Sequence, residues 1–331
     1  MAILKPSQLR LEADAALQQS AYNPKMLVLI HTAVSLGLAV LITSLNFYLN
    51  QQIADTGGLA GLGTRSILTT IQTMLQYGNA IALPFWEAGL IFSMLCWLKG
   101  ESAGPASLLQ GFRRFGQIVL LRFVQGLLFF SLAMATLTLC LTIYLATPMS
   151  ESMMALMEPL LEDAVSAEQA QAMMQEADFL FASTEAMLPM LGLFLLVFAV
   201  IALPLFYRMR FAIFSVMDGS GALAAIVHSS RMTKKNRLQL VKLDLSFWWF
   251  YLLQLLCMAL CYGDLLLPML NIQLPFQEDT AFFLFFLLGT LCQGALLWYF
   301  RAHVLTTYGA AYRQLWQKPP SPREENLPFR V

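Results

Sequence analysis

Six long blocks of apolar residues constrain the fold of this chain more than any other feature of its sequence. They cover residues of about 26–50, 77–98, 117–146, 188–217, 246–270 and 281–302. Each block is long enough for a helix to cross a hydrocarbon layer about 30 Å thick, which takes roughly 20 helical residues. We therefore predict an all-α fold: a polytopic bundle of six transmembrane helices in one integral membrane domain over 1–331.

The overall composition agrees with this prediction, because 58% of the residues are hydrophobic and only 12% are charged. A soluble domain carries about 25% charged residues, so this chain has too little polar surface to coat a soluble globule. The N-terminal region contains Glu12 and Asp14 and lacks the short apolar core of a cleaved signal peptide. The first block is therefore expected to be retained as a signal anchor.

The distribution of Lys and Arg predicts the orientation of the helices. All 20 of these residues except Arg65 lie before the first block, after the last block, or in and beside the second and fourth gaps. Positively charged loops are held on the cytoplasmic side during insertion. We therefore predict that both termini face the cytoplasm, including an amphipathic N-terminal segment at 1–25 and a tail at 303–331.

The densest basic cluster lies in SSRMTKKNRLQLVKLDLSFWWF, residues 229–250, directly before the fifth block. Basic residues beside aromatic ones can bind nucleic acid, where the aromatic rings stack on bases. Here Phe247, Trp248 and Trp249 belong to the apolar block and form an interfacial belt, so no nucleic-acid partner is expected. Anionic lipid headgroups are the expected partner, bound by Arg231, Lys234, Lys235, Arg237 and Lys242.

Short amphipathic helices are predicted before the first, third and fifth blocks, in QLRLEADAALQQS, PASLLQGFRRF and ALAAIVHSSRMTKKN. Each is followed by a break, near Asn23, Gly116 or Asn236, and then by a membrane helix. The third of these helices can be capped by Asp218 or Ser220, and it carries an apolar stripe of Leu223, Ile226, Val227 and Ser230. This layout suits helices in the headgroup plane and suggests three repeated units of interfacial helix plus membrane hairpin.

Three segments resemble an uncharacterised family of bacterial multi-spanning membrane proteins, domain of unknown function 975, which is common in Firmicutes. The segments are LKGESAGPASLLQGFRRF (98–115), AIVHSSRMTKKNRLQLVKLDLSFWW (225–249) and YGAAYRQL (308–315). The resemblance implies six spans in a bacterial cytoplasmic membrane. It implies no activity and no catalytic residue.

The third gap, residues 147–187, is the only sizeable segment expected outside the membrane. It contains eight acidic residues and no Lys or Arg, which agrees with an external location. Two short helices separated near Pro159 are expected there. Met149, Met153, Met154 and Met157 fall on one side of the first; thioethers could bind Cu(I), but Met more commonly fills an apolar helix face, and no metal site is predicted.

Glu87 is the one charge placed at the centre of a predicted span, with Pro84 one turn before it. An acidic group at the bilayer centre costs about 2.5–3.5 kcal/mol on insertion scales, so it should face the bundle or a wet cavity, or be protonated. One interpretation is a proton or cation site, with His31, Gln125 and Gln293 as possible neighbours. The other is a protonated Glu87 that hydrogen-bonds across helices, or to the carbonyl left free by Pro84.

No enzyme motif is present: the chain has three His residues and lacks a zinc-protease, nucleophile-elbow or phosphate-loop pattern. We therefore expect no catalytic activity and no cofactor. The favoured hypothesis is a non-catalytic membrane protein that acts through lipids, membrane-protein partners or a homo-oligomer. The alternative is a small-molecule or ion transporter with Glu87 as its coupling site, because transporters often combine repeats with interrupted helices.

Overall fold

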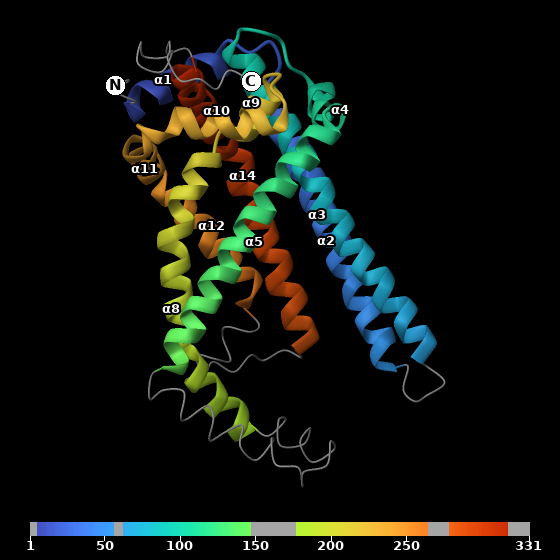
Figure 1. Cartoon of the computed structure of the whole chain (residues 1–331). Helices are drawn as coiled ribbons and strands as arrows, with labels where there is room; N and C mark the ends of the chain where they lie inside the picture. The colour runs from blue at the N-terminus through green and yellow to red at the C-terminus, as the bar shows by residue number, and fades with distance from the viewer. Residues whose placement is uncertain (1–4, 56–61, 147–176, 264–277, 317–331) are drawn as a thin grey trace. The chain divides into compact units, whose positions relative to one another are not determined.

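The computed structural model describes residues 5–55, 62–146, 177–263 and 278–316, and every regular element within these ranges is a helix (Figure 1). The all-α prediction is confirmed for this part of the chain. The elements are α1 (Pro6–Gln18), α2 (Pro24–Asp55), α3 (Leu62–Leu98), the 3-10 helix η2 (Pro105–Leu109), α4 (Gln110–Arg113), α5 (Phe115–Leu145), α8 (Ala177–Met209), α9 (Ala212–Met217), α10 (Ala222–Lys234), α11 (Arg237–Leu245), α12 (Trp248–Cys261) and α14 (Glu278–Trp316).

Within the described ranges, four helical stretches are long and apolar enough to cross a membrane: Pro24–Leu49, Phe115–Tyr144, Leu191–Met217 and Ala281–Trp316. A fifth is present if α11 and α12, which meet at a bend of 61°, together form one broken span. Two shorter apolar segments, Ser66–Leu75 and Ala82–Leu98, lie on α3. Membrane association is therefore supported, whereas the sixth span and the three repeated units stay predictions.

Several element boundaries differ from those expected. Helix α3 begins at Leu62, not near 77, and it continues through Pro84 without ending. Helix α8 begins at Ala177, so the expected external segment 147–187 is helical in its last part; residues 147–176, with Pro159 and the four Met residues, lie outside the described residues. The expected fifth span begins with a bend between α11 and α12 at Ser246 and Phe247, and its end beyond 263 also lies outside the described residues.

The chain divides into two compact units. The first contains Met1–Leu121 and Arg210–Val331, and the second contains Arg122–Met209. The second unit therefore holds most of α5 together with α8. On α5, the hydroxyls of Thr136, Thr138 and Thr142 each donate a hydrogen bond to the carbonyl four residues earlier. The single domain expected from the sequence stays a prediction.

Two antiparallel hairpins organise the first unit. In the α2–α3 hairpin, the ring of His31 stacks on Trp86 with centroids 5.8 Å apart. In the α12–α14 hairpin, the rings of Trp249 and Phe300 lie 4.6 Å apart. At the other end of this hairpin the two backbones approach closely, because a Cβ added to Gly289 would overlap Cys261.

Helices α3 and α14 pack side by side in parallel. Three contacts follow both helices in the same direction: Glu87 with Arg301, Met94 with Thr306, and Leu98 with Arg313. The ends of both helices therefore lie on the same side of the unit.

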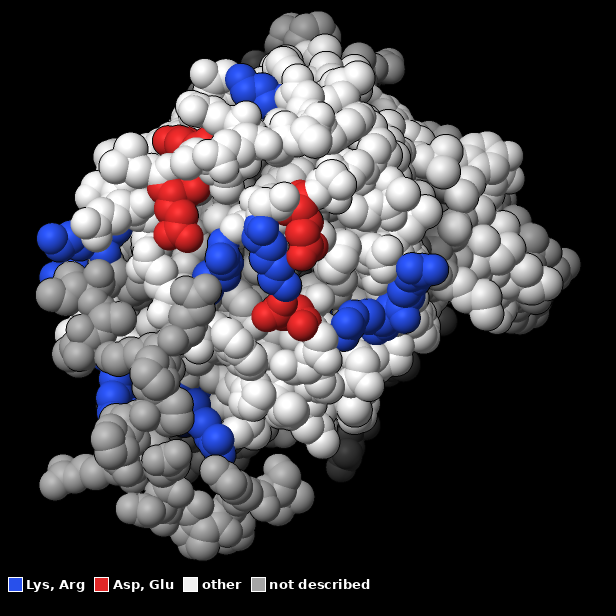
Figure 2. All heavy atoms as spheres, turned by 90° about the horizontal axis from the view of Figure 1, so that it is seen from above, with Lys and Arg blue, Asp and Glu red and all other residues white. Residues whose placement is uncertain are grey.

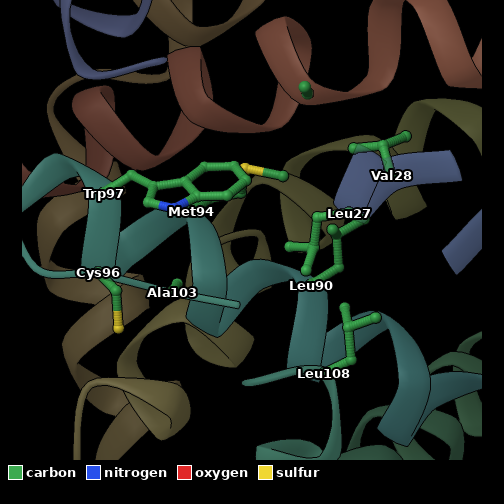
Figure 3. Close-up of a cluster of buried hydrophobic side chains, with 9 residues drawn as sticks. Leu27, Val28, Leu90, Met94, Cys96, Trp97, Ala103 and Leu108 are labelled. Carbon is green, nitrogen blue, oxygen red and sulfur yellow. The ribbon is translucent and has the colours of Figure 1, made fainter. Parts of the chain in front are cut away.

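A cluster of buried apolar residues joins the start of α2, the end of α3, the segment after it and α14 (Figure 3). Its members are Leu27, Val28, Leu90, Met94, Cys96, Trp97, Ala103, Leu108 and Ala302. Small residues let η2 and α4 lie directly on α3: a Cβ on Gly89 would overlap the carbonyl oxygen of Leu108, and one on Gly111 would overlap that of Phe85. The hydroxyls of Ser93 and Ser107 also hydrogen-bond, at 2.5 Å.

Helix α14 continues to Trp316, so the first part of the expected cytoplasmic tail at 303–331 is a packed helix. No residue from Ala302 to Leu315 is exposed, and Thr306, Gly309 and Ala310 are buried. Much of this segment is small or polar. Its burial therefore depends on close packing against neighbouring helices, and its composition does not reveal it.

Candidate functional site

The carboxylate of Glu87 forms an ion pair with Arg301: Nη2 of Arg301 donates to Oε1 of Glu87 at 2.8 Å. The Arg301 side chain is 17% exposed and the Glu87 side chain is 46% exposed. A guanidinium stays protonated at any physiological pH, so a fixed positive charge faces this carboxylate. The interpretation of Glu87 as a protonated residue that hydrogen-bonds across helices therefore needs revision, because its partner on the neighbouring helix is the charged Arg301.

Of the neighbours expected for Glu87, His31 contacts Trp86, the residue that precedes Glu87. Its ring stacks on Trp86, and the indole Nε1 of Trp86 donates to the carbonyl of His31 at 3.1 Å. His31 is 1% exposed, and neither of its ring nitrogens has a hydrogen-bond partner among the described residues. The buried imidazole therefore packs on the residue that precedes Glu87 in α3.

The two glutamines are not part of this arrangement in the contacts that the structure describes. Gln125 lies on α5 in the second unit, where its side-chain oxygen accepts a bond from Arg122 at 3.4 Å. Gln293 lies on α14 about two turns before Arg301, which is about 12 Å along the helix axis. Pro84 lies one turn before Glu87, within the continuous helix α3.

Sequence reasoning missed Arg301, because this residue was assigned to the boundary after the sixth span. The pair joins positions 214 residues apart. One feature of the sequence could have indicated the pair: Glu87 and Arg301 are each the first charge after an uncharged stretch of α3 or α14. Only the parallel packing of these helices brings the two charges together.

Two further ion pairs lie on the same side of the first unit. Lys99 contacts Asp218 at 2.5 Å, and Tyr312 donates a hydrogen bond to the same carboxylate at 3.2 Å. This network differs from the cap expected for α10: its N-cap residue is Gly221, and the side-chain oxygen of Gln117 accepts from the backbone N–H of Ala222 at 2.7 Å. Asp218 instead connects the end of α3 with the end of α14.

The second pair, between Arg210 and Asp244, is more enclosed. Nη1 of Arg210 lies 2.5 Å from Oδ2 of Asp244, and the hydroxyl of Tyr308 donates to Oδ1 at 2.5 Å. The Arg210 guanidinium lies over the Tyr308 ring, 4.3 Å from its centroid. Tyr251 and Tyr308 share a hydrogen bond of 2.7 Å between their hydroxyls. This network holds α11 and α12 against α14.

Helix α1 is attached to the same side by three polar contacts. His303 and Asp14 lie 2.8 Å apart, and Gln314 donates to Glu12 at 3.0 Å. Arg10 donates to the carbonyl of Ser246, at the bend between α11 and α12, and its guanidinium lies over Phe247. The helix expected to lie in the headgroup plane therefore packs on α14 and on this bend.

The predicted lipid-binding residues lie on α10, on α11 and in the turn between them. Arg231, Lys234, Lys235 and Lys242 are exposed, and Arg237 is half-buried. The described residues place no carboxylate in ion-pair contact with Arg231, Lys234 or Lys242. Figure 2, which views the molecule from above Figure 1, shows acidic side chains lying next to basic ones on this face. The exposed bases of α10 and α11 remain available to an external anion.

Helix α10 packs against protein through a face other than its apolar stripe. Its buried residues are small: Ala222, Ala225, Ser229 and Thr233. The hydroxyl of Ser229 accepts a hydrogen bond from the backbone N–H of Phe211 at 3.1 Å. From the predicted apolar stripe, Leu223 and Val227 are exposed. Small residues allow the close approach to α9 and leave the larger apolar side chains facing outward.

No group of three or more His, Cys, Asp or Glu side chains that could hold a metal ion is found in the described ranges. The carboxylates of Glu87, Asp218 and Asp244 are each held by a basic partner. The arrangement can therefore hold helices together, and it presents cations to a surface. No protein-family model, curated protein or solved structure matches the chain.

Proposed function

We propose that this chain is a non-catalytic, multi-spanning membrane protein that acts through anionic lipid headgroups bound at the surface of α10 and α11. The observation that carries the proposal is a difference between two sets of basic residues. Lys99, Arg210 and Arg301 each contact a carboxylate within the first unit. The exposed bases of α10 and α11 have no such contact within the described residues, so their charge is directed outward.

Exposed apolar side chains accompany these bases. Leu223 and Val227 lie on α10, Leu238 and Leu245 lie on α11, and Leu238 is 80% exposed. A helix that combines basic and apolar residues on its outer face binds the boundary between headgroups and acyl chains. This combination favours a lipid surface over a soluble acidic partner, because a soluble acidic partner would not cover the exposed leucines.

Replacing Arg231, Lys234 and Lys242 together with Gln tests the proposal. A basic residue near an anionic membrane contributes about 1 kcal/mol to binding, so the triple variant should bind phosphatidylglycerol at least tenfold more weakly in native mass spectrometry. Binding of phosphatidylcholine should be unchanged. The matched control exchanges Arg for Lys and Lys for Arg at these positions and should retain lipid binding. Equal phosphatidylglycerol binding by all three proteins would contradict the proposal.

A small-molecule or ion transporter with Glu87 at its coupling site is the second candidate. The observation that favours it is the buried imidazole of His31, which stacks on Trp86 directly before Glu87 and has neither ring nitrogen bonded among the described residues. The ion pair with Arg301 weighs against it, because a coupling carboxylate has to exchange its proton or cation. We therefore favour the lipid-binding role.

The proposal places the chain in a bacterial cytoplasmic membrane with both termini in the cytoplasm. The support is the distribution of Lys and Arg, together with the resemblance to the uncharacterised membrane family, and the exposed α10–α11 surface would then face the inner leaflet. Membrane-protein partners or a second copy of the chain could use the same surface. Binding of such a partner would come in addition to the lipid interaction, because every membrane helix contacts the bilayer.

A further inference from the structure

Uncharged stretches of equal length precede Glu87 on α3 and Arg301 on α14. No charged residue lies between Arg65 and Glu87, or between Asp279 and Arg301. Each stretch contains about 21 residues, which corresponds to about 31 Å of helix. This length matches the hydrocarbon thickness of a bilayer, about 30 Å. Because the two helices are parallel and the two charges touch, both stretches end at the same level.

Aromatic residues surround the pair at this level. Trp86 directly precedes Glu87. Trp298 and Tyr299 lie within one turn of Arg301, and their side chains are exposed. The amine of Lys25, at the start of α2, lies 4.9 Å from the centroid of the Tyr299 ring. Trp and Tyr are enriched where membrane helices cross the headgroup region. We name Lys25, Trp298, Tyr299 and the exposed Trp248 of α12 the interfacial girdle.

The pattern of burial changes at the same level. Before Arg301, α14 exposes Leu284, Leu287, Leu288 and Leu291. After it, no residue from Ala302 to Leu315 is exposed. On α3, every residue from Ala88 to Leu98 is buried except Phe92, which is half-buried. Lipid can cover the exposed leucines, whereas the later segments of both helices are already covered by protein.

We infer that one boundary of the bilayer lies at the Glu87–Arg301 pair, and that the interfacial girdle contacts the lipid headgroups. Helices α1, η2 and α4, together with the ends of α3 and α14, form a folded layer outside the hydrocarbon. Glu87 is therefore an interfacial residue, not a residue of the bilayer centre. This inference requires insertion of the helices into a membrane, but it does not require lipid binding by α10 and α11.

The inference is tested by measuring the depth of single Trp residues in liposomes. One variant keeps Trp298 and replaces the other five of the six Trp residues with Phe. A second variant replaces all six with Phe and carries Leu291→Trp. Positions 291 and 298 are seven residues apart, so they share a face of α14 and lie about 10 Å apart along its axis.

Lipids brominated near the headgroup should quench Trp298 at least twofold more strongly than lipids brominated near the end of the acyl chain. Leu291→Trp should show the reverse order. If Glu87 lay at the bilayer centre, the deep bromines would quench Trp298 more strongly, because it lies within one turn of Arg301. Stronger quenching of Trp298 by the deep bromines would overturn the inference.

A second measurement uses the unmodified chain and so does not depend on the folding of Trp-depleted variants. A phospholipid that carries a carbene precursor at the end of its acyl chain is activated in liposomes, and the labelled peptides are identified by mass spectrometry. Label should appear within 283–291 and be absent from 302–316. Labelling of 302–316 would place this segment in the hydrocarbon and refute the inference. Neither measurement depends on headgroup charge, so its failure is distinguishable from failure of the α10–α11 proposal.

Discussion

Neutralising the two partners of the Glu87–Arg301 ion pair should show that they stabilise the fold together. Two unit charges about 4 Å apart interact by about 4 kcal/mol at an effective dielectric constant of 20, and by about 1 kcal/mol in water. The Glu87 side chain is 46% exposed and Arg301 is 17% exposed. Solvent screening of the exposed partner reduces the larger value, so we expect a coupling energy of about 1–2 kcal/mol.

The measurement is a double-mutant cycle on the purified protein, with unfolding followed by titration of a denaturing detergent into micelles. Glu87→Gln and Arg301→Gln should each lower the free energy of unfolding, and the double variant should lose less than the sum of the two. Exchanging the residues, Glu87→Arg with Arg301→Glu, should recover part of the loss. The control cycle pairs Glu87→Gln with Gln293→Leu, two turns away on α14, and should show additivity within about 0.5 kcal/mol.

Additivity of Glu87→Gln and Arg301→Gln would refute the reasoning, because it would mean that the two charges do not interact in the folded protein. The same Glu87→Gln variant also addresses the transport alternative. A proton-driven or cation-driven flux in liposomes that is lost in this variant, while its unfolding remains cooperative, would move the balance toward transport.

Two further predictions concern the packing of the first unit. Gly89→Ala should lower the free energy of unfolding by about 1–3 kcal/mol, as overpacking does, because the added Cβ overlaps the backbone of Leu108; Gly78→Ala on the same helix meets no atom within 4 Å and should be neutral or stabilising. Asp244→Asn should cost about 3 kcal/mol by leaving Arg210 enclosed without its counter-charge, whereas Lys99→Gln, in a pair whose Lys side chain is 41% exposed, should cost less than about 1 kcal/mol. Both comparisons use the same titration. Equal losses for Gly89→Ala and Gly78→Ala would contradict the close packing at Gly89, and equal losses for Asp244→Asn and Lys99→Gln would contradict the greater burial of the Arg210–Asp244 pair.

The sequence predicted the helical class and the positions of most long helices because apolar length is a local signal. It missed the end of α14, because Thr306, Gly309 and Ala310 are buried without being strongly apolar. Such residues become buried by close helix contact, which depends on the neighbouring chain. The predicted sixth block ends at 302, although the helix continues for fourteen residues to Trp316.

The faces of α10 show a related limit. Periodicity identified an apolar stripe suited to a helix in the headgroup plane, and its residues Leu223 and Val227 are exposed. It did not identify the protein-facing side, where the small residues Ala225 and Ser229 are buried. For a soluble helix, the apolar stripe would have been the correct choice of packing face. At a membrane surface the larger apolar side chains can face lipid, so hydropathy alone does not identify the protein-facing side.

The three segments that carry the family resemblance are joined to one another by hydrogen bonds in the first unit. Within YGAAYRQL (308–315), Arg313 donates to the carbonyl of Leu98, where the segment 98–115 begins. Tyr308 of the same motif donates to Asp244, which lies in the segment 225–249. The residues of these motifs thus act as mutual packing partners in the helical layer at the end of α14. These motif residues are used in contacts between helices, so the outward-facing bases of α10 and α11 are the better place to test for the function of this chain.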